Sequence, residues 1–145
     1  MAAKSSTRRK AASPAWVVLK FGGTSVSSVE RWETIATLLR QRLAEGLRPV
    51  VVHSALATVS NKLDELLHRA LEMDVTAQVA GIRELHLRLA AGLQVDGEKE
   101  LGGYFRELEQ LLAGIHLIRE VSPRIQARVM GLGELMATRL GAAYL

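Results

Sequence analysis

Two short apolar runs near the start of the chain predict β-strands. The first is the segment 16–21, Trp-Val-Val-Leu-Lys-Phe, and the second is the segment 50–53, which follows Pro49. Runs that are almost continuously apolar are typical of parallel strands covered on both faces. Apolar residues recur at helical spacing between them, so the pattern predicts a parallel β-α-β unit with a right-handed crossover. The apolar face of this helix is predicted to contain Val29, Trp32, Ile35, Ala36, Leu39 and Leu43.

Capping residues mark the two ends of this first helix. Ser27 and Glu30 have the spacing of a capping box, in which each side chain bonds the backbone amide of the other residue. Gly46 is expected to end the helix, because glycine readily adopts the left-handed conformation that follows many helices.

The remainder of the chain predicts only helices. Apolar residues at helical spacing predict helices over 59–73, 75–93, about 101–118 and from Pro123 onward, with a turn at 94–100. Ser122 is expected to be the N-cap of the last helix, with proline at its first position. The predicted fold class is therefore α/β. Two strands offer little surface for five helices, so we expect a fragment of a larger domain that contains further strands.

Composition excludes several classes of protein. The 145 residues are 48% hydrophobic and 23% charged, which is typical of one globular domain. Cysteine is absent, so disulfides and thiolate metal sites are excluded, and no apolar run approaches the roughly 18 residues of a membrane span. The four histidines lack metal-ligand spacing. We therefore expect no metal site and no membrane partner.

The net positive charge comes from the first fifteen residues. Lys4, Arg8, Arg9 and Lys10 lie there without an acidic residue, and the other 15 basic residues balance the 15 acidic ones. We expect the segment 1–15 to be a disordered basic tail, with a very short organelle-targeting peptide as the alternative. Nucleic-acid binders usually carry a basic excess on a folded surface, so no nucleic-acid partner is expected.

The segment 20–26, Lys-Phe-Gly-Gly-Thr-Ser-Val, has the clearest chemical character. A predicted strand ends in this segment, and a double glycine then leads towards a helix. Glycines allow backbone conformations and close approach that a Cβ would forbid, and amides at a helix start bind anions. Lys20 would neutralise a transferring phosphoryl group, and Thr24 or Ser25 would add a hydroxyl donor. The alternative is a tight strand-to-helix turn with an exposed lysine.

Three motifs together resemble the aspartate kinases, within the amino-acid kinase superfamily. The first is the segment 20–26. The second, 51–61, is similar to the family's strand, Ser-Ala-x-Ala-Gly-Val-Thr-Asn loop and helix. The third, 133–138, has the sequence Gly-Glu-Leu-Met-Ala-Thr and is similar to the family's Gly-Glu helix start. The resemblance implies an amino-acid kinase fold, with residues 16–145 as the N-terminal part of the catalytic domain.

The resemblance also implies a reaction. A phosphoryl group would pass from ATP, accompanied by Mg²⁺, to the side-chain carboxylate of L-aspartate, giving 4-phospho-L-aspartate and ADP. This is the first step towards lysine, threonine and methionine. On the nucleotide side, Lys20 would stabilise the transferring group, while Gly22, Gly23 and Thr24 would line the phosphate path.

The second and third motifs supply the expected aspartate side of the site. By resemblance, Ser54 and Ser60 would hold the aspartate, with Ser60 replacing the usual threonine. Glu134 would pair with the α-ammonium group of the substrate. Without the resemblance, Glu134 would be interpreted as an ordinary exposed helix residue. Thr58 stands where the family usually has glycine, which puts the loop geometry in question if that position needs a positive φ.

The family also implies properties of the whole enzyme, namely a cytoplasmic location and a homo-oligomer at full length. The 145-residue chain is expected to be inactive alone. Two alternatives stay open. One is an amino-acid kinase with a different acceptor, and the other is a non-catalytic module that self-associates through an uncovered apolar surface.

Overall fold

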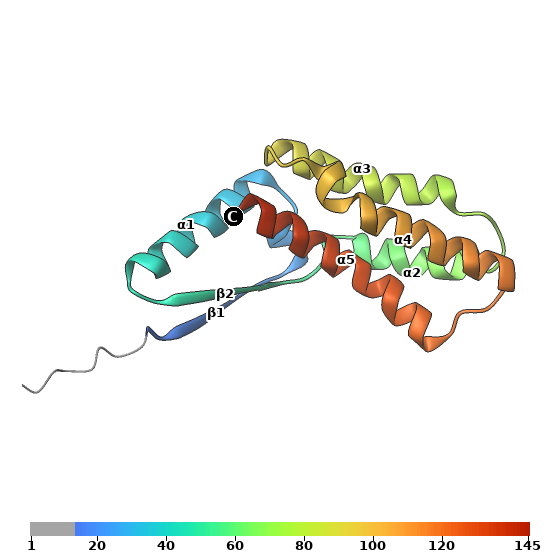
Figure 1. Ribbon diagram of the computed structural model, residues 1–145, viewed down its shortest axis with the longest axis horizontal. Coiled ribbons are helices and arrows are strands. Elements are labelled where there is room, and N and C mark those ends of the chain that lie inside the picture. The colour runs from blue at the N-terminus through green and yellow to red at the C-terminus, as the bar shows by residue number, and fades with distance from the viewer. Residues whose placement is uncertain (1–13) are drawn as a thin grey trace, which may run out of the picture.

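The computed structural model describes residues 14–145, so the tail predicted for residues 1–15 lies almost entirely outside the described residues. Residues 14–145 form a strand, a 3-10 turn, a helix and a second strand, and four helices follow (Figure 1). The elements are β1 (Trp16–Phe21), η1 (Gly23–Val26), α1 (Val29–Ala44), β2 (Arg48–His53), α2 (Val59–Ala70), α3 (Thr76–Gly92), α4 (Gly97–Ile118) and α5 (Pro123–Tyr144). The predicted α/β class is confirmed.

The two strands pair in parallel, as predicted, and their carboxyl ends lie side by side. The register runs from Trp16 opposite Arg48 to Phe21 opposite His53. The expectation that both faces of the strands are covered is wrong, because Trp16 is 67% and Val18 66% exposed. Alternate residues of both strands are partly buried instead. One face of the sheet is therefore packed and the other is open within residues 14–145.

The N-terminus of α1 differs from the predicted capping box. Ser28, not Ser27, is the N-cap residue, and α1 begins at Val29. Hydrogen bonds from its own backbone N–H and from the Ser28 hydroxyl lower the pKa of the Glu30 carboxyl. Ser27 has a different role, described below. The predicted stop at Gly46 is confirmed, since this glycine has a φ of +77° just after the helix.

Helices α2 to α5 form a helical unit beside the strands (Figure 1). Ion pairs between Arg128 and Glu107 and between Arg139 and Glu100 join α4 and α5, and their order shows that these helices are antiparallel. The predicted turn at 94–100 is too long. Helix α4 already begins at Gly97, because the Asp96 side chain accepts a hydrogen bond from the Lys99 amide at 3.1 Å. Within residues 14–145, no helix is both long and apolar enough to span a membrane.

The C-terminal end of α5 connects the helical unit to the strands. Figure 1 shows this end beside α1. Gly141 lies directly on the indole of Trp32, where a Cβ would overlap the ring. The Trp32 ring is fully buried, and its Nε1 donates to the Val26 carbonyl at 2.9 Å. The same ring meets the His53 imidazole edge-on, with 5.4 Å between centroids.

A histidine is buried between α3 and α4. His86 is fully buried, its Nδ1 lies 2.8 Å from the Ile82 carbonyl, and its ring packs edge-on against Phe105. Its Nε2 has no hydrogen-bond partner in the described part of the chain. Burial lowers the pKa of His86, and the bond to Ile82 opposes this effect only partly. The fold therefore disfavours the protonated form of this imidazole.

We predict that the free energy of unfolding falls as the pH drops below about 6.5, the ordinary pKa of histidine. The unfolded chain then binds a proton on His86 more readily than the folded chain does, which costs up to about 1.4 kcal/mol per pH unit. Urea denaturation at pH values between about 7.5 and 5.5 measures this dependence. His86→Leu should make the dependence shallower, whereas His68→Leu, at an exposed position on α2, should not. An unchanged slope in His86→Leu would contradict the prediction.

Candidate functional site

The two loops that follow the strands touch each other at Gly23. A Cβ added there would lie 2.7 Å from the Ala55 carbonyl oxygen and 3.4 Å from the Ser54 Oγ. Gly22 instead faces open space, with no atom within 4 Å of the position that a Cβ would take. Neither glycine has a positive φ, so the expected conformational role of the pair is wrong. Gly23 is required by close packing between two loops, and Gly22 leaves room beside them.

Lys20 and Thr24, the other predicted site residues of the first motif, are exposed. Lys20 lies opposite Val52 on the open face of the sheet, one residue before β1 ends. Thr24 lies in η1, a 3-10 turn that separates the glycines from α1. The sequence pattern did not predict this turn. Lys20 and Thr24 are thus positioned at the carboxyl edge of the sheet with their side chains open to solvent.

The second motif forms the other half of this edge. Ser54 is partly buried directly after β2, and Ser60 is exposed at the second position of α2. Buried Ala55 and Leu56 anchor the loop between them. Thr58 has a φ of +70° and a ψ of −15°, which is the left-handed region. The position therefore does need a positive φ, and a β-branched residue adopts it under strain.

Helix α5 brings the third motif to the same loop. A Cβ added at Gly133 would lie 3.0 Å from Leu63, 3.1 Å from Val59 and 3.2 Å from Ala55. This glycine allows α5 to pack closely against the start of α2 and the loop after β2. Glu134 is the next residue and is exposed. The structure thus brings the backbone of all three motifs together, although no hydrogen bond joins Lys20, Ser60 and Glu134 within residues 14–145.

Ser27 connects the two loops, and the sequence analysis did not identify it as a site residue. Its Oγ donates to the Gly23 carbonyl at 2.6 Å and accepts from the Ala57 amide at 2.8 Å. Ser27 and Ala57 are 30 residues apart along the chain. The sequence signal was ambiguous, because Ser27 and Ser28 are adjacent serines and either can be the N-cap of α1.

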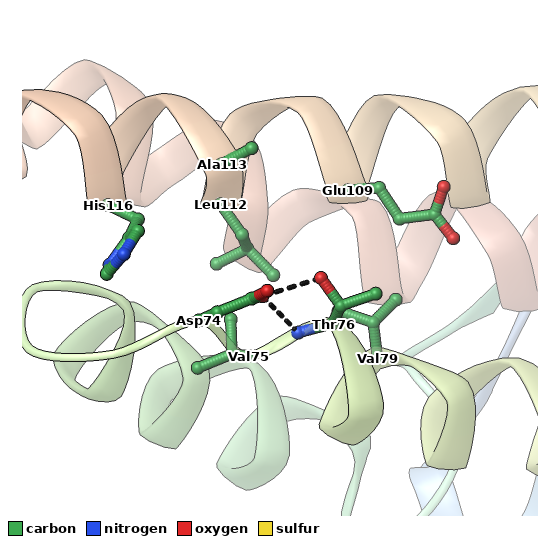
Figure 2. A pocket seen from close by; sticks show the side chains of 8 residues that line it. All are labelled: Asp74, Val75, Thr76, Val79, Glu109, Leu112, Ala113 and His116. Atoms are coloured by element: carbon green, nitrogen blue, oxygen red, sulfur yellow. Dashed lines mark hydrogen bonds between the residues drawn. The ribbon is translucent and has the colours of Figure 1, made fainter.

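A pocket of about 160 Å³ lies at the opposite end of α2, between the start of α3 and α4 (Figure 2). None of the predicted site residues lines it. The Asp74 carboxylate points to Thr76 and accepts bonds from its amide at 2.9 Å and its hydroxyl at 2.6 Å. These bonds, with a smaller effect of His116, lower the pKa of Asp74. The Asp74 carboxylate is therefore already bound within its own turn. The pocket is separate from the carboxyl edge of the sheet, where the three motifs meet.

Comparison with known proteins assigns nearly the whole chain to one family. Residues 15–145 match the family model described as the amino acid kinase family. The chain belongs to this family. A solved structure titled as Escherichia coli aspartokinase III in complex with aspartate and ADP shares the fold, with a TM-score of 0.74. That match has 24% sequence identity and covers 90% of this chain and 28% of the other.

The similar curated proteins of this family are aspartokinases. Aspartokinase 2, chloroplastic, of Arabidopsis thaliana is 40% identical over 136 residues, which are 88% of this chain and 24% of that protein. Aspartokinase of Schizosaccharomyces pombe is 33% identical over 148 residues, which cover 92% of this chain and 28% of that protein. The chain therefore spans about a quarter of the length of these relatives.

We predict that Gly23→Ala lowers the free energy of unfolding by about 1–3 kcal/mol, the usual range for overpacking. The new methyl group would push the glycine turn away from the Ala55 carbonyl. Denaturant unfolding measures the loss. Gly22→Ala is the matched control, and its effect should stay within about 0.5 kcal/mol because no atom opposes the methyl group. Equal effects at both glycines would contradict the packing argument.

Thr58→Gly is predicted to raise the free energy of unfolding by about 1 kcal/mol, because glycine adopts the left-handed region without strain. Thr37→Gly is the control, since Thr37 is an exposed residue within helix α1. There the same change should lower stability by about 0.3–0.5 kcal/mol through helix propensity. Thermal unfolding of the two variants compares them. A loss of stability in Thr58→Gly would show that the loop does not hold strain at this position.

Proposed function

We propose that this chain carries part of the active site of an aspartate kinase. The observation that supports the proposal most directly is the meeting of three motifs at the carboxyl edge of the sheet. Gly23 contacts the Ser54–Ala55 turn, and Gly133 packs α5 against the same turn. The curated relatives are named aspartokinases, and this chain matches 24% of the length of the Arabidopsis thaliana protein. The complete activity is therefore proposed for a site to which this chain contributes one part.

The reaction transfers the γ-phosphoryl group of ATP to the side-chain carboxylate of L-aspartate. The carboxylate oxygen forms the new P–O bond, the bond to the β-phosphate oxygen breaks, and ADP leaves with 4-phospho-L-aspartate as the other product. Lys20 offsets the negative charge of the transferring group, and the space beside Gly22 admits the phosphates next to Gly23 and Thr24. A fixed positive charge close to the transferring oxygens lowers the barrier, since charge is spread over those oxygens.

The acceptor is held from the opposite side. Ser54 and Ser60 donate hydroxyl hydrogen bonds to aspartate, and Glu134 pairs with its α-ammonium group. A negatively charged residue on α5 therefore favours an acceptor with a free amino group. This feature argues for aspartate over acceptors whose nitrogen is acylated.

Mg²⁺ is proposed to arrive with the nucleotide. Residues 14–145 contain no group of three acidic or histidine side chains that could hold a metal ion. The donor set of this part of the chain does not suit a resident cation, whereas Mg²⁺ is commonly bound through substrate phosphates and water. Assembly into a homo-oligomer, a cytoplasmic location and a role in lysine biosynthesis belong to the same proposal for the full-length enzyme.

The chain alone is proposed to bind ligands with little or no turnover. Lys20, Thr24, Ser60 and Glu134 are all exposed. Electrostatic catalysis of phosphoryl transfer is strongest where water is excluded, because water weakens each charge interaction. Residues 14–145 position these groups without enclosing them.

L-Aspartate should therefore bind the chain weakly, and Glu134→Gln should reduce its affinity about tenfold or more by removing the partner of the α-ammonium group. Titrations followed by NMR measure the affinity for aspartate, glutamate and N-acetylglutamate, of which N-acetylglutamate should bind least. Glu120→Gln, at an exposed position after α4, is the control and should retain the wild-type affinity.

Two results would change this conclusion. Aspartate-dependent ADP release by the chain, abolished in Lys20→Ala, would show that these residues suffice for turnover. Concentration-dependent association without any response to aspartate would favour a self-associating module instead. The exposed apolar residues Trp16 and Val18 on the open sheet face are the observation that supports that second candidate.

A further inference from the structure

Ser27 connects the glycine turn to the loop after β2 through a single atom. A hydroxyl has one hydrogen to donate and two lone pairs, so the Ser27 Oγ can bond the Gly23 carbonyl and the Ala57 amide at once. The distances of 2.6 and 2.8 Å are short for both bonds. We name this pair of hydrogen bonds the Ser27 clamp.

The clamp acts at a point where the loops leave little free space. A Cβ at Gly23 would lie only 2.7 Å from the Ala55 carbonyl oxygen, so the turn has little space to move towards the loop. The clamp in turn prevents movement away, because separation would break a hydrogen bond. Packing therefore opposes a shorter distance between the two loops, and the hydrogen bonds oppose a longer one.

The clamp also adjoins the strained residue of the loop. Ala57 immediately precedes Thr58, whose φ is +70°. The Thr58 carbonyl accepts a bond from the Lys62 amide at 3.0 Å on the other side. Strained conformations persist when neighbouring contacts hold them from both sides. The Ser27 clamp supplies the upstream contact, and the first turn of α2 supplies the downstream one.

We propose that Ser27 is a positioning residue that couples the phosphate side of the site to the aspartate side. This coupling rests on the proposed function. Gly23 belongs to the phosphate path, and Ala57 lies between Ser54 and Ser60, which hold the acceptor. A ligand that shifts one loop therefore shifts the other through the clamp. In this role Ser27 acts through its bonds to Gly23 and Ala57 and not through a direct bond to a ligand.

Hydrogen exchange tests the clamp without any ligand. In Ser27→Ala, the Ala57 amide loses its acceptor and should exchange about tenfold faster with solvent. Ser27→Thr keeps the hydroxyl and should restore slow exchange. Ser28→Ala is the matched control, because its hydroxyl bonds Glu30 and neither loop. An unchanged Ala57 exchange rate in Ser27→Ala would overturn the clamp.

Titration with L-aspartate, followed through backbone amide signals, tests the coupling. In the wild-type chain, aspartate should shift the amides of Ser54 and Ser60 and also those of Gly22 to Thr24. Ser27→Ala should retain the first set of shifts and lose the second, while Ser27→Thr and Ser28→Ala should retain both. Shifts of the glycine turn that persist in Ser27→Ala would overturn the coupling.

The two proposals fail in different ways. If aspartate does not shift the amide signals of Ser54, Ser60 and Glu134 in the wild-type chain, the proposed function is refuted and the coupling with it. The hydrogen-exchange rate of the Ala57 amide would still test whether the Ser27 clamp exists. If Ser27→Ala does not fold, the comparison is repeated in the Thr58→Gly background, where the loop has no strain to hold. If Ser27→Ala also fails to fold in that background while Ser28→Ala folds, Ser27 is required for folding itself. That result would overturn a role limited to positioning.

Discussion

The buried indole of Trp32 is the contact on which the arrangement of this structure depends. It belongs to α1, donates to the carbonyl at the end of η1, and meets the imidazole at the end of β2. Gly141 of α5 lies on its ring, and Tyr144 packs edge-on at 6.1 Å between centroids. One side chain thus connects the strand unit to the last helix. Packing around Gly133 adds a second contact, between α5 and the loop that follows β2.

Two glycines give α5 its orientation. Gly133 sits against the start of α2 and Gly141 sits on Trp32, so close contacts fix the helix at two separate points. On its other side, ion pairs to α4 set its position along the helical unit. Glu134 therefore has a backbone position set by packing, although its side chain is exposed. Packing therefore fixes where this acidic residue starts from α5, and its exposed side chain keeps rotational freedom.

Local patterns in the sequence predicted most of the fold, because the two apolar runs, Gly46 and the Ser122–Pro123 pair each have a local physical cause. Local ambiguity explains the misplaced start of α4. The polar segment 94–100 suits either a turn or a helix start, and the Asp96 cap decides between them. Contacts within the site depend instead on long-range packing, since nothing near Gly23 in the sequence indicates that Ala55 will lie against it. The family resemblance thus identified the motifs, whereas the sequence did not indicate the distances between them.

The chain has two tryptophans, and they lie in opposite surroundings. Trp16 is 67% exposed at the edge of the sheet with the Arg48 guanidinium 5.5 Å from its ring centroid, whereas Trp32 is fully shielded. Their fluorescence therefore reports on different parts of the molecule. Quenchers dissolved in water reach the Trp16 indole. The emission of Trp32 instead depends on whether α5 remains packed against α1. Intrinsic emission can in this way separate local changes at the strands from detachment of the last helix.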